Sequence, residues 1–384
     1  MKNNKSSVLF VSTYPPRQCG IATFTRDLKT AMDRKFNSKF KSKVVAMVNS
    51  ESGKLKYSNE VILKINRVDT QDYIDAAKKI NKMDSVKLVN IQHEFGLYGG
   101  KYFNYLTAFL DKINRPVCIT LHSVPPNPKD NIKSIIQYLA MKSSSFIVMV
   151  DKAVEILSKD YGINNKKIVV IPHGIHEVPY ERSVVQKAKL GYKDKLLISS
   201  FGLISKFKNY EVIIKALPKV VKKYPNLLYL IMGRTHPGIA EIDGEKYRNS
   251  LKKLISRLNL EGNVKFINKY LDLNELHQYL RATDIFVSSG TGLGQIVSGT
   301  LSYAMGCGRP VITIPFLHAK EVVTKDRGIL VELGNPKSYK EAIIKLLSNP
   351  ELREKMGKNA YKYTRQMTWP NVAESYMKVF NEYM

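Results

Sequence analysis

Short apolar runs alternate with longer amphipathic segments along nearly the whole chain. Apolar runs of about four to seven residues are typical of buried strands, and the segments between them have helical spacing. This alternation predicts an α/β fold in which helices cover parallel sheets. The expected strands are 8–12, 44–48, 61–65, 88–92, 117–121, 146–150 and 168–171 in the first half, and 196–201, 227–232, 264–267, 285–288, 311–314 and 328–331 in the second.

Two sheets imply two domains, and a chain of 384 residues is long enough to bury both cores. We expect residues 1–180 to form one Rossmann-like domain and residues 181–365 another, with a polar linker over 173–195. Trp369-Pro370 then precedes a helical pattern over 371–383. Since proline is favourable at a helix start, residues 366–384 are expected to form a separate C-terminal helix.

A glycine-bearing loop, a short helix and a strand follow one another over residues 294–312. Ser298, Gly299 and Thr300 stand where the helix would begin. Free N–H groups and the helix dipole favour an anion at such a position. The pattern therefore fits a phosphate site, although by itself it fits an ordinary loop–helix–strand unit better.

The chain carries a formal net charge of +28, spread over both halves. That spread disfavours a nucleic-acid module and favours a surface that attracts anionic membranes, polyanionic acceptors or phosphorylated substrates. The densest basic cluster, Arg34–Lys43, includes two phenylalanines. It fits either a membrane-surface patch or a solvated loop.

The sequence shows no apolar run of about 18 residues and no signal-peptide pattern at its start. Its three cysteines are far apart, which argues against a disulfide framework or a zinc site. We therefore expect a cytoplasmic protein, and the basic surface also fits peripheral contact with the inner face of the membrane.

Polar residues and glycines gather directly after the expected strands, where ligands bind in such sheets. Six motifs occur in this order along the chain: residues 12–24 (STYPPRQCGIATF), 92–96 (QHEFG), 121–122 (LH), 171–174 (IPHG), 201–205 (FGLIS) with Lys208, and 304–311 (AMGCGRPV). Together they resemble the family-4 retaining glycosyltransferases of the GT-B type over nearly the whole chain. The resemblance implies two Rossmann-like domains that face across a cleft and a C-terminal helix that crosses back to the first domain.

The resemblance also implies a metal-independent hexosyltransferase without a cofactor. Its donor would be a UDP- or GDP-hexose, and its acceptor a carbohydrate or a lipid-linked sugar, as in polysaccharide biosynthesis. In the implied front-face mechanism the leaving phosphate accepts the proton of the incoming hydroxyl. Lys208 and Lys206 would neutralise the leaving diphosphate, and His122 would contact the donor sugar; Lys206 also fits a surface charge, and His122 a structural role.

The remaining candidate residues divide between the two substrates. On the donor side the resemblance implies Gly20, Gly202, Gln295, Ser298, Gly299, Thr300 and Tyr303. On the acceptor side it implies Arg17, His93 and Glu94. Arg17 fits a salt bridge on its loop equally well, and the pair at 93–94 fits an internal hydrogen bond.

The chain departs from the family pattern at three positions. Gln295 and Tyr303 stand where the family has two glutamates, and Leu203 stands where it has an arginine. An amide and a phenol can still hydrogen-bond sugar hydroxyls, but carboxylate recognition of the ribose is lost. This departure keeps open a non-catalytic GT-B subunit or sugar-binding scaffold, and a GT-B glycoside phosphorylase remains a third alternative.

Overall fold

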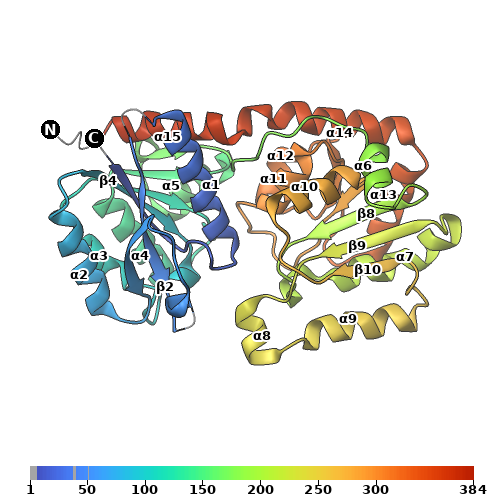
Figure 1. Ribbon diagram of the computed structural model, residues 1–384, viewed down its shortest axis with the longest axis horizontal. Coiled ribbons are helices and arrows are strands. Elements are labelled where there is room, and N and C mark those ends of the chain that lie inside the picture. Colours follow the sequence, from blue (N-terminus) through green and yellow to red (C-terminus); the bar gives the residue numbers. More distant parts are fainter. Residues whose placement is uncertain (1–6, 38–39, 51) are drawn as a thin grey trace. The chain divides into compact units, whose positions relative to one another are not determined.

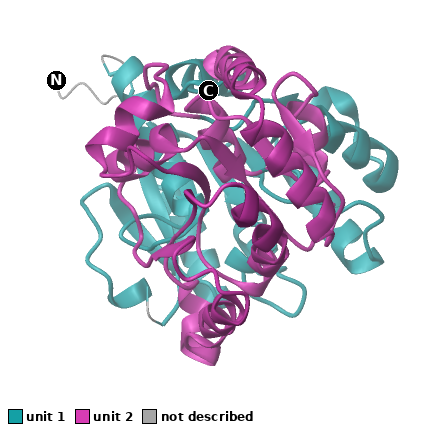
Figure 2. Cartoon of the chain, turned by 90° about the vertical axis from the view of Figure 1, so that its right-hand side faces the viewer, with its two compact units in different colours: residues 1–174, 294–297, 367–384 teal, residues 175–293, 298–366 magenta. Residues whose placement is uncertain are grey.

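The computed structural model describes residues 7–37, 40–50 and 52–384. The chain divides into two compact units, which Figure 2 shows in different colours. Unit 1 consists of residues 1–174, 294–297 and 367–384, and unit 2 of residues 175–293 and 298–366. The polypeptide therefore leaves unit 2 briefly at residue 294 and finally at residue 367.

Unit 1 is built on a seven-stranded parallel sheet in the order β3-β2-β1-β4-β5-β6-β7. Its inner strands are almost fully buried, which explains why they read as continuous apolar runs. The strands are β1 (Ser7–Ser12), β2 (Lys43–Val48), β3 (Val61–Asn66), β4 (Val86–His93), β5 (Val117–Leu121), β6 (Ser145–Val148) and β7 (Ile168–Val170).

Helices connect the strands of unit 1, and the C-terminal helix also belongs to this unit (Figure 1). They are α1 (Gly20–Lys35), α2 (Thr70–Asn81), α3 (Leu106–Leu110), α4 (Asp130–Lys142), α5 (Asp151–Tyr161) and α15 (Trp369–Asn381), with short 3-10 turns at 52–54, 95–97 and 165–167. The last of them, α15, begins at Trp369, two residues before the expected helical pattern over 371–383, and Pro370 occupies its first turn. It packs along α1 and buries Trp369, Tyr376 and Phe380 in the core of unit 1.

Unit 2 is built on a six-stranded parallel sheet in the order β10-β9-β8-β11-β12-β13. The strands are β8 (Leu196–Phe201), β9 (Leu227–Met232), β10 (Val264–Ile267), β11 (Ile285–Val287), β12 (Val311–Thr313) and β13 (Gly328–Leu330). The helices are α6 (Ser183–Lys189), α7 (Tyr210–Lys223), α8 (Pro237–Asp243), α9 (Lys246–Arg257), α10 (Leu273–Ala282), α11 (Gly299–Gly306), α12 (Leu317–Val322), α13 (Pro336–Leu347) and α14 (Pro350–Thr364), with 3-10 turns at 206–208 and 365–367.

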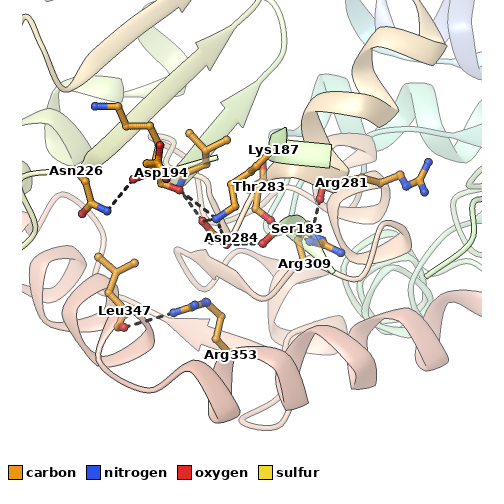
Figure 3. A network of polar contacts seen from close by, with 12 residues as sticks. Ser183, Lys187, Asp194, Asn226, Arg281, Thr283, Asp284, Arg309, Leu347 and Arg353 are labelled. Atoms are coloured by element: carbon orange, nitrogen blue, oxygen red, sulfur yellow. Dashed lines mark hydrogen bonds and ion pairs between the residues drawn. The ribbon is translucent and has the colours of Figure 1, made fainter. Parts of the chain in front are cut away.

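A buried polar network holds the N-terminal ends of β8 and β11 together (Figure 3). Asp284 accepts hydrogen bonds from Lys187 Nζ at 2.9 Å, Leu197 N at 2.8 Å and Ser183 Oγ at 2.5 Å. Nearby, the buried guanidinium of Arg309 donates to four backbone carbonyls, those of residues 181, 281, 283 and 307. The charges of Lys187 and Asp284 thus offset each other, and the Arg309 guanidinium is hydrogen-bonded to carbonyls, as buried charges require.

The predicted fold class is confirmed, because each half of the chain forms a parallel sheet covered by helices. The polar stretch over 173–195, which we expected to be a linker, contains α6 and contributes the side chains of Ser183 and Lys187 to the buried network. The lysines of this stretch led us to expect a solvated segment. Lys187 is nevertheless only 7% exposed, because its ion pair with Asp284 allows its burial.

The basic cluster around Arg34–Lys43 has a structural explanation for its aromatic residues. Residues 38 and 39 lie outside the described part of the chain. Phe40 is 4% exposed, and Phe36 packs against the same core of unit 1. Lys35 pairs with Glu374 of α15 at 2.6 Å. The phenylalanines therefore do not form the apolar half of a membrane patch.

Candidate functional site

In unit 1 the loop between β1 and α1 is anchored by charged groups. Tyr14 donates to Glu60 Oε2 at 2.7 Å, and Lys29 pairs with Glu60 Oε1 at 2.5 Å. Arg17, on the same loop, forms no ion pair with any described residue, so the predicted alternative of a salt bridge is not seen there. A Cβ on Gly20 would meet nothing within 4 Å. Packing within the chain therefore gives no reason for glycine at position 20.

His93 ends β4 and lies wholly inside unit 1. It is 0% exposed, and neither ring nitrogen has a hydrogen-bond partner among the described residues. Its ring stacks on Tyr98 at 5.5 Å and meets Phe95 edge-on at 5.0 Å. Burial lowers the pKa of His93 to about 3, so the ring is neutral. The expected acceptor contact is corrected here, because His93 has no exposed ring atom, and the internal hydrogen bond is absent too.

Glu94 follows His93 and makes the internal contacts. Its carboxylate accepts from Ser123 Oγ at 2.5 Å and from Phe95 N at 3.1 Å. Burial raises the pKa of Glu94, and the two hydrogen bonds oppose that shift. The bond to Ser123 ties the carboxyl end of β4 to that of β5. Glu94 is therefore a fixed acceptor of hydrogen bonds at this edge of the sheet.

His122 follows β5 at the same edge and is 7% exposed. Its Nε2 lies 2.8 Å from Gln92 Oε1, and its ring meets Phe24 edge-on at 4.9 Å. Burial, with smaller contributions from His173 and His93, lowers the pKa of His122 to about 3. At neutral pH it is therefore an uncharged imidazole in a fixed orientation, suited to hydrogen bonding.

In unit 2 the predicted cation Lys208 lies beside the loop after β8. A Cβ on Gly202 would stand 3.5 Å from Lys208 Nζ and 3.6 Å from Thr300 Cγ2, so these three residues meet at one point. Lys208 has no ion pair or side-chain hydrogen bond with a described residue, and burial lowers the pKa of its ammonium group. A partly enclosed cation without an anion is a candidate binding site for one.

The position of Lys208 is set by a serine to which the sequence pattern assigned no role. Ser289, just after β11, donates from its hydroxyl to Lys208 O at 2.5 Å and to Asn209 O at 3.0 Å. Asn209 adopts a left-handed conformation with φ of 49°. The hydrogen bonds of Ser289 hold the 3-10 turn over 206–208 against the carboxyl end of β11. A lone serine after a strand carries too little signal to be found from sequence.

The N-terminus of α11 supplies fewer free amides than expected. Ser298 N donates to His318 Nδ1 at 2.9 Å, so the prediction of a free amide at Ser298 is wrong. The N-cap hydroxyl of Ser298 accepts from Leu301 N at 3.3 Å. The N–H groups of Gly299 and Thr300 have no hydrogen-bond partner among the described residues. Two amides and the positive end of the helix therefore lie next to Gly202 and Lys208.

Lys206 is exposed, and it too makes no ion pair with a described residue. Between the two lysines Phe207 is 74% exposed. The structure thus distinguishes a partly buried Lys208 from a solvated Lys206, although both stand on one short turn.

The two residues that replace the family's glutamates lie in different units. Gln295 belongs to unit 1, is exposed, and donates from Nε2 to Val297 O at 2.5 Å. Tyr303, in α11 of unit 2, is 8% exposed. Its ring stacks on His176 at 5.8 Å and contacts His277 at 6.3 Å and Phe201 at 6.4 Å. Tyr303 therefore packs among aromatic rings, one helical turn after Thr300 in α11.

Within the described residues, no group of three or more His, Cys, Asp or Glu side chains is arranged to hold a metal ion. No helix of that part of the chain is long and apolar enough to cross a membrane. The chemically distinctive features are thus two: a fixed neutral imidazole with a carboxylate in unit 1, and a cation with two free amides in unit 2.

Residues 183–363 match the family described as Glycosyl transferases group 1. The matched region includes Gly202, Lys208 and the start of α11.

The curated relatives include glycosyltransferases by name. An uncharacterized glycosyltransferase of Methanocaldococcus jannaschii is 30% identical over 249 residues, which are 63% of this chain and 59% of that protein. The GDP-mannose-dependent monoacylated alpha-(1-6)-phosphatidylinositol monomannoside mannosyltransferase of Corynebacterium glutamicum is 30% identical over 185 residues, 47% of this chain and 45% of that protein. The chain thus spans about half of the length of these relatives.

Among solved structures, Anabaena HepE in complex with UDP and glucose superimposes with a TM-score of 0.77. The match covers 98% of this chain and 100% of that one, at 15% sequence identity. At this identity the likeness shows the fold, and it supports the GT-B arrangement of two Rossmann-like halves.

Proposed function

We propose that this chain, whose residues 183–363 match the group 1 glycosyl transferases, moves a hexose from a nucleotide diphosphate sugar to a carbohydrate or lipid-linked acceptor. One observation carries the proposal. Among the described residues, Lys208 is a partly buried cation without an anion, and it adjoins Gly202 and the amides of Gly299 and Thr300, which have no partner there either. That arrangement fits a diphosphate.

The chemistry of sugar transfer explains why such a group is needed. When the bond to the sugar breaks, negative charge builds up on the leaving diphosphate, and fixed donors stabilise that charge most in the transition state. Lys208 supplies a full positive charge, and the two amides supply donors that need no rearrangement. Gly202, with φ of 128°, lets the backbone pass close to the ligand without a side chain.

We assign the sugar to His122, whose neutral imidazole would hydrogen-bond a sugar hydroxyl. Gln295 and Tyr303 are assigned to the donor by the sequence pattern, Tyr303 through its phenol or its ring face. The reaction would retain the anomeric configuration by a front-face path, in which the leaving phosphate takes the proton of the incoming hydroxyl. Neither a protein base nor a metal ion enters this path.

On the acceptor side we assign Arg17 and Glu94, whereas Gly20 is assigned to the donor side. Arg17 forms no ion pair within the described part of the chain, and Glu94 is held by Ser123 at the carboxyl edge of the unit 1 sheet. The name of the Corynebacterium relative includes a phosphatidylinositol mannoside, which supports a lipid-linked acceptor. A net charge of +28 would favour work at an anionic membrane face in the cytoplasm.

A non-catalytic, sugar-binding subunit is the second candidate, because Gln295 and Tyr303 replace two carboxylates. Incubation of the purified chain with UDP-, GDP- and ADP-hexoses, with lipid and carbohydrate acceptors, separates the two. We expect transfer or slow hydrolysis from one donor. Binding without either would favour the scaffold, and absence of both binding and turnover would refute the proposal.

A further inference from the structure

A chain of buried hydrogen bonds runs beneath His122 in unit 1. Asn90 and Gln92 project from β4 and Thr120 from β5, and all three are 0% exposed. Gln92 Nε2 lies 2.5 Å from Asn90 Oδ1, and Gln92 Oε1 lies 2.8 Å from His122 Nε2. Buried amides of this kind are held in one orientation when each atom has a partner.

One backbone carbonyl fixes the donor and acceptor roles along this series of hydrogen bonds. Asn90 Nδ2 lies 3.1 Å from Cys118 O, and a carbonyl oxygen can only accept a hydrogen bond. The amide nitrogen of Asn90 must therefore face Cys118. The Asn90 oxygen then faces Gln92, so Gln92 must donate a hydrogen bond to it from Nε2.

Thr120 supports the same orientation. Its hydroxyl oxygen accepts from Asn90 Nδ2 at 3.3 Å and from Gln92 Nε2 at 3.4 Å. With both acceptor positions used, its proton points to the hydroxyl of Tyr376 in α15, 3.2 Å away. A flipped Gln92 would place its oxygen against Asn90 Oδ1, which can only accept a hydrogen bond.

The consequence reaches the imidazole. Because Gln92 must present Oε1 to His122, Nε2 of His122 must carry a proton. The pKa of His122 is lowered to about 3 by burial, so the ring holds only that proton at neutral pH. Nδ1 is then an unprotonated nitrogen with a lone pair, and it has no hydrogen-bond partner among the described residues.

We propose that Gln92 is a positioning residue, which holds His122 as its Nε2-protonated tautomer so that Nδ1 accepts a hydrogen bond from a hydroxyl of the donor sugar. The part that concerns the sugar rests on the proposed function. The part that concerns the tautomer rests only on unit 1.

This assignment constrains the ligand. A group that meets Nδ1 has to donate, as a hydroxyl does, whereas fluorine or a carbonyl oxygen cannot. Removing a donor from a buried acceptor costs about 1–3 kcal/mol, a loss of roughly 5- to 150-fold in binding. One hydroxyl of the donor sugar should therefore be intolerant of replacement by fluorine.

Nitrogen NMR on the intact, histidine-labelled chain tests the tautomer without any variant. His173 is an internal reference of the opposite kind, because its Nδ1 lies 2.8 Å from the carbonyl oxygen of Gly174 and so must carry a proton. At pH 7 we expect a protonated Nε2 and an unprotonated Nδ1 for His122. A protonated Nδ1 on His122, in either a neutral or a charged ring, would overturn the proposal.

A Gln92→Met variant tests the positioning role. Gln137→Met in α4 is the control for the substitution itself, since among the described residues the exposed Gln137 side chain hydrogen-bonds only to Tyr161 O. Gln92→Met should shift His122 toward the Nδ1-protonated tautomer, and the control should not. A purely structural role for Gln92 would lower stability yet leave the tautomer unchanged, which would contradict the proposal. If Gln92→Met does not fold, the unmodified chain still decides the question.

Binding of UDP-glucose, GDP-mannose and their monofluorinated deoxy analogues completes the test. We expect one fluorinated position to weaken binding by roughly 5- to 150-fold, and Gln92→Met to shrink that penalty. Equal binding of all analogues would overturn the acceptor role of Nδ1. A confirmed tautomer with no nucleotide-sugar binding would instead refute the proposed function, and with it the sugar contact.

Discussion

Replacement of Lys208 by methionine removes the charge that is expected to face the leaving diphosphate while keeping most of the side chain's volume. The ammonium group lies at the point where Gly202 and Thr300 meet, with no anion from the described residues to neutralise it. Any negative charge that arrives there therefore meets the full positive charge. The variant isolates this one electrostatic contribution.

The size of the effect follows from Coulomb's law. One unit of charge that develops at about 4 Å from the ammonium group interacts by about 4 kcal/mol at an effective dielectric constant near 20. Because Lys208 is only partly enclosed, we discount this to about 2–4 kcal/mol, a loss of roughly 30- to 1,000-fold in kcat/KM. Removal of a single oxyanion donor elsewhere costs about 100- to 1,000-fold, which is comparable.

The assay compares transfer rates of Lys208→Met with those of Lys206→Met and Lys215→Met. Lys215 is an exposed residue of α7 and serves as the control for loss of a surface charge. Lys206→Met decides whether that solvated lysine also contacts the diphosphate. A Lys208→Met variant that retains the rate of the unmodified chain would refute the reasoning about the leaving group.

The pH dependence gives a second view of the same charge. Burial lowers the pKa of Lys208, so the ammonium group loses its proton at a lower pH than an ordinary lysine. The cation is present below that pKa and absent above it. We expect kcat/KM to fall on the alkaline side, and the fall to disappear in Lys208→Met if residual activity is measurable.

Three further substitutions have expected outcomes. Gly202→Ala places a side chain at φ of 128°, which costs about 1–3 kcal/mol of strain and should lower donor affinity, measured by titration calorimetry. Asp284→Ala leaves Lys187 buried without its partner and should lower the free energy of unfolding by about 3–5 kcal/mol, seen in urea denaturation, while the folded fraction keeps its kcat. Gly174→Ala would put a Cβ 2.3 Å from Trp369 Cε3 and should lower the free energy of unfolding by about 1–3 kcal/mol in the same assay. Wild-type stability of Asp284→Ala or of Gly174→Ala would contradict the packing described.

The strands were predictable because buried parallel strands leave continuous apolar runs. The runs at 117–121, 196–201 and 227–232 coincide with β5, β8 and β9. The short helix α6 was missed because Lys187, a polar residue, is buried against a partner almost a hundred positions later. Long-range pairing of charges is not visible in a local pattern.

The candidate site was predictable as a set of positions and less so in its contacts. Lys208, Gly202 and Thr300 do come together in unit 2. The predicted acceptor contact of His93 was wrong because Phe95 and Tyr98 enclose its ring. The predicted free amide of Ser298 was wrong because it donates to His318. Such contacts depend on the three-dimensional packing of separate segments.

A crystal structure of the chain with bound UDP or GDP tests the central claim most directly. We predict phosphate oxygens within hydrogen-bond distance of Lys208 Nζ and of the N–H groups of Gly299 and Thr300. A diphosphate bound elsewhere, with these three groups still unoccupied, would contradict the account.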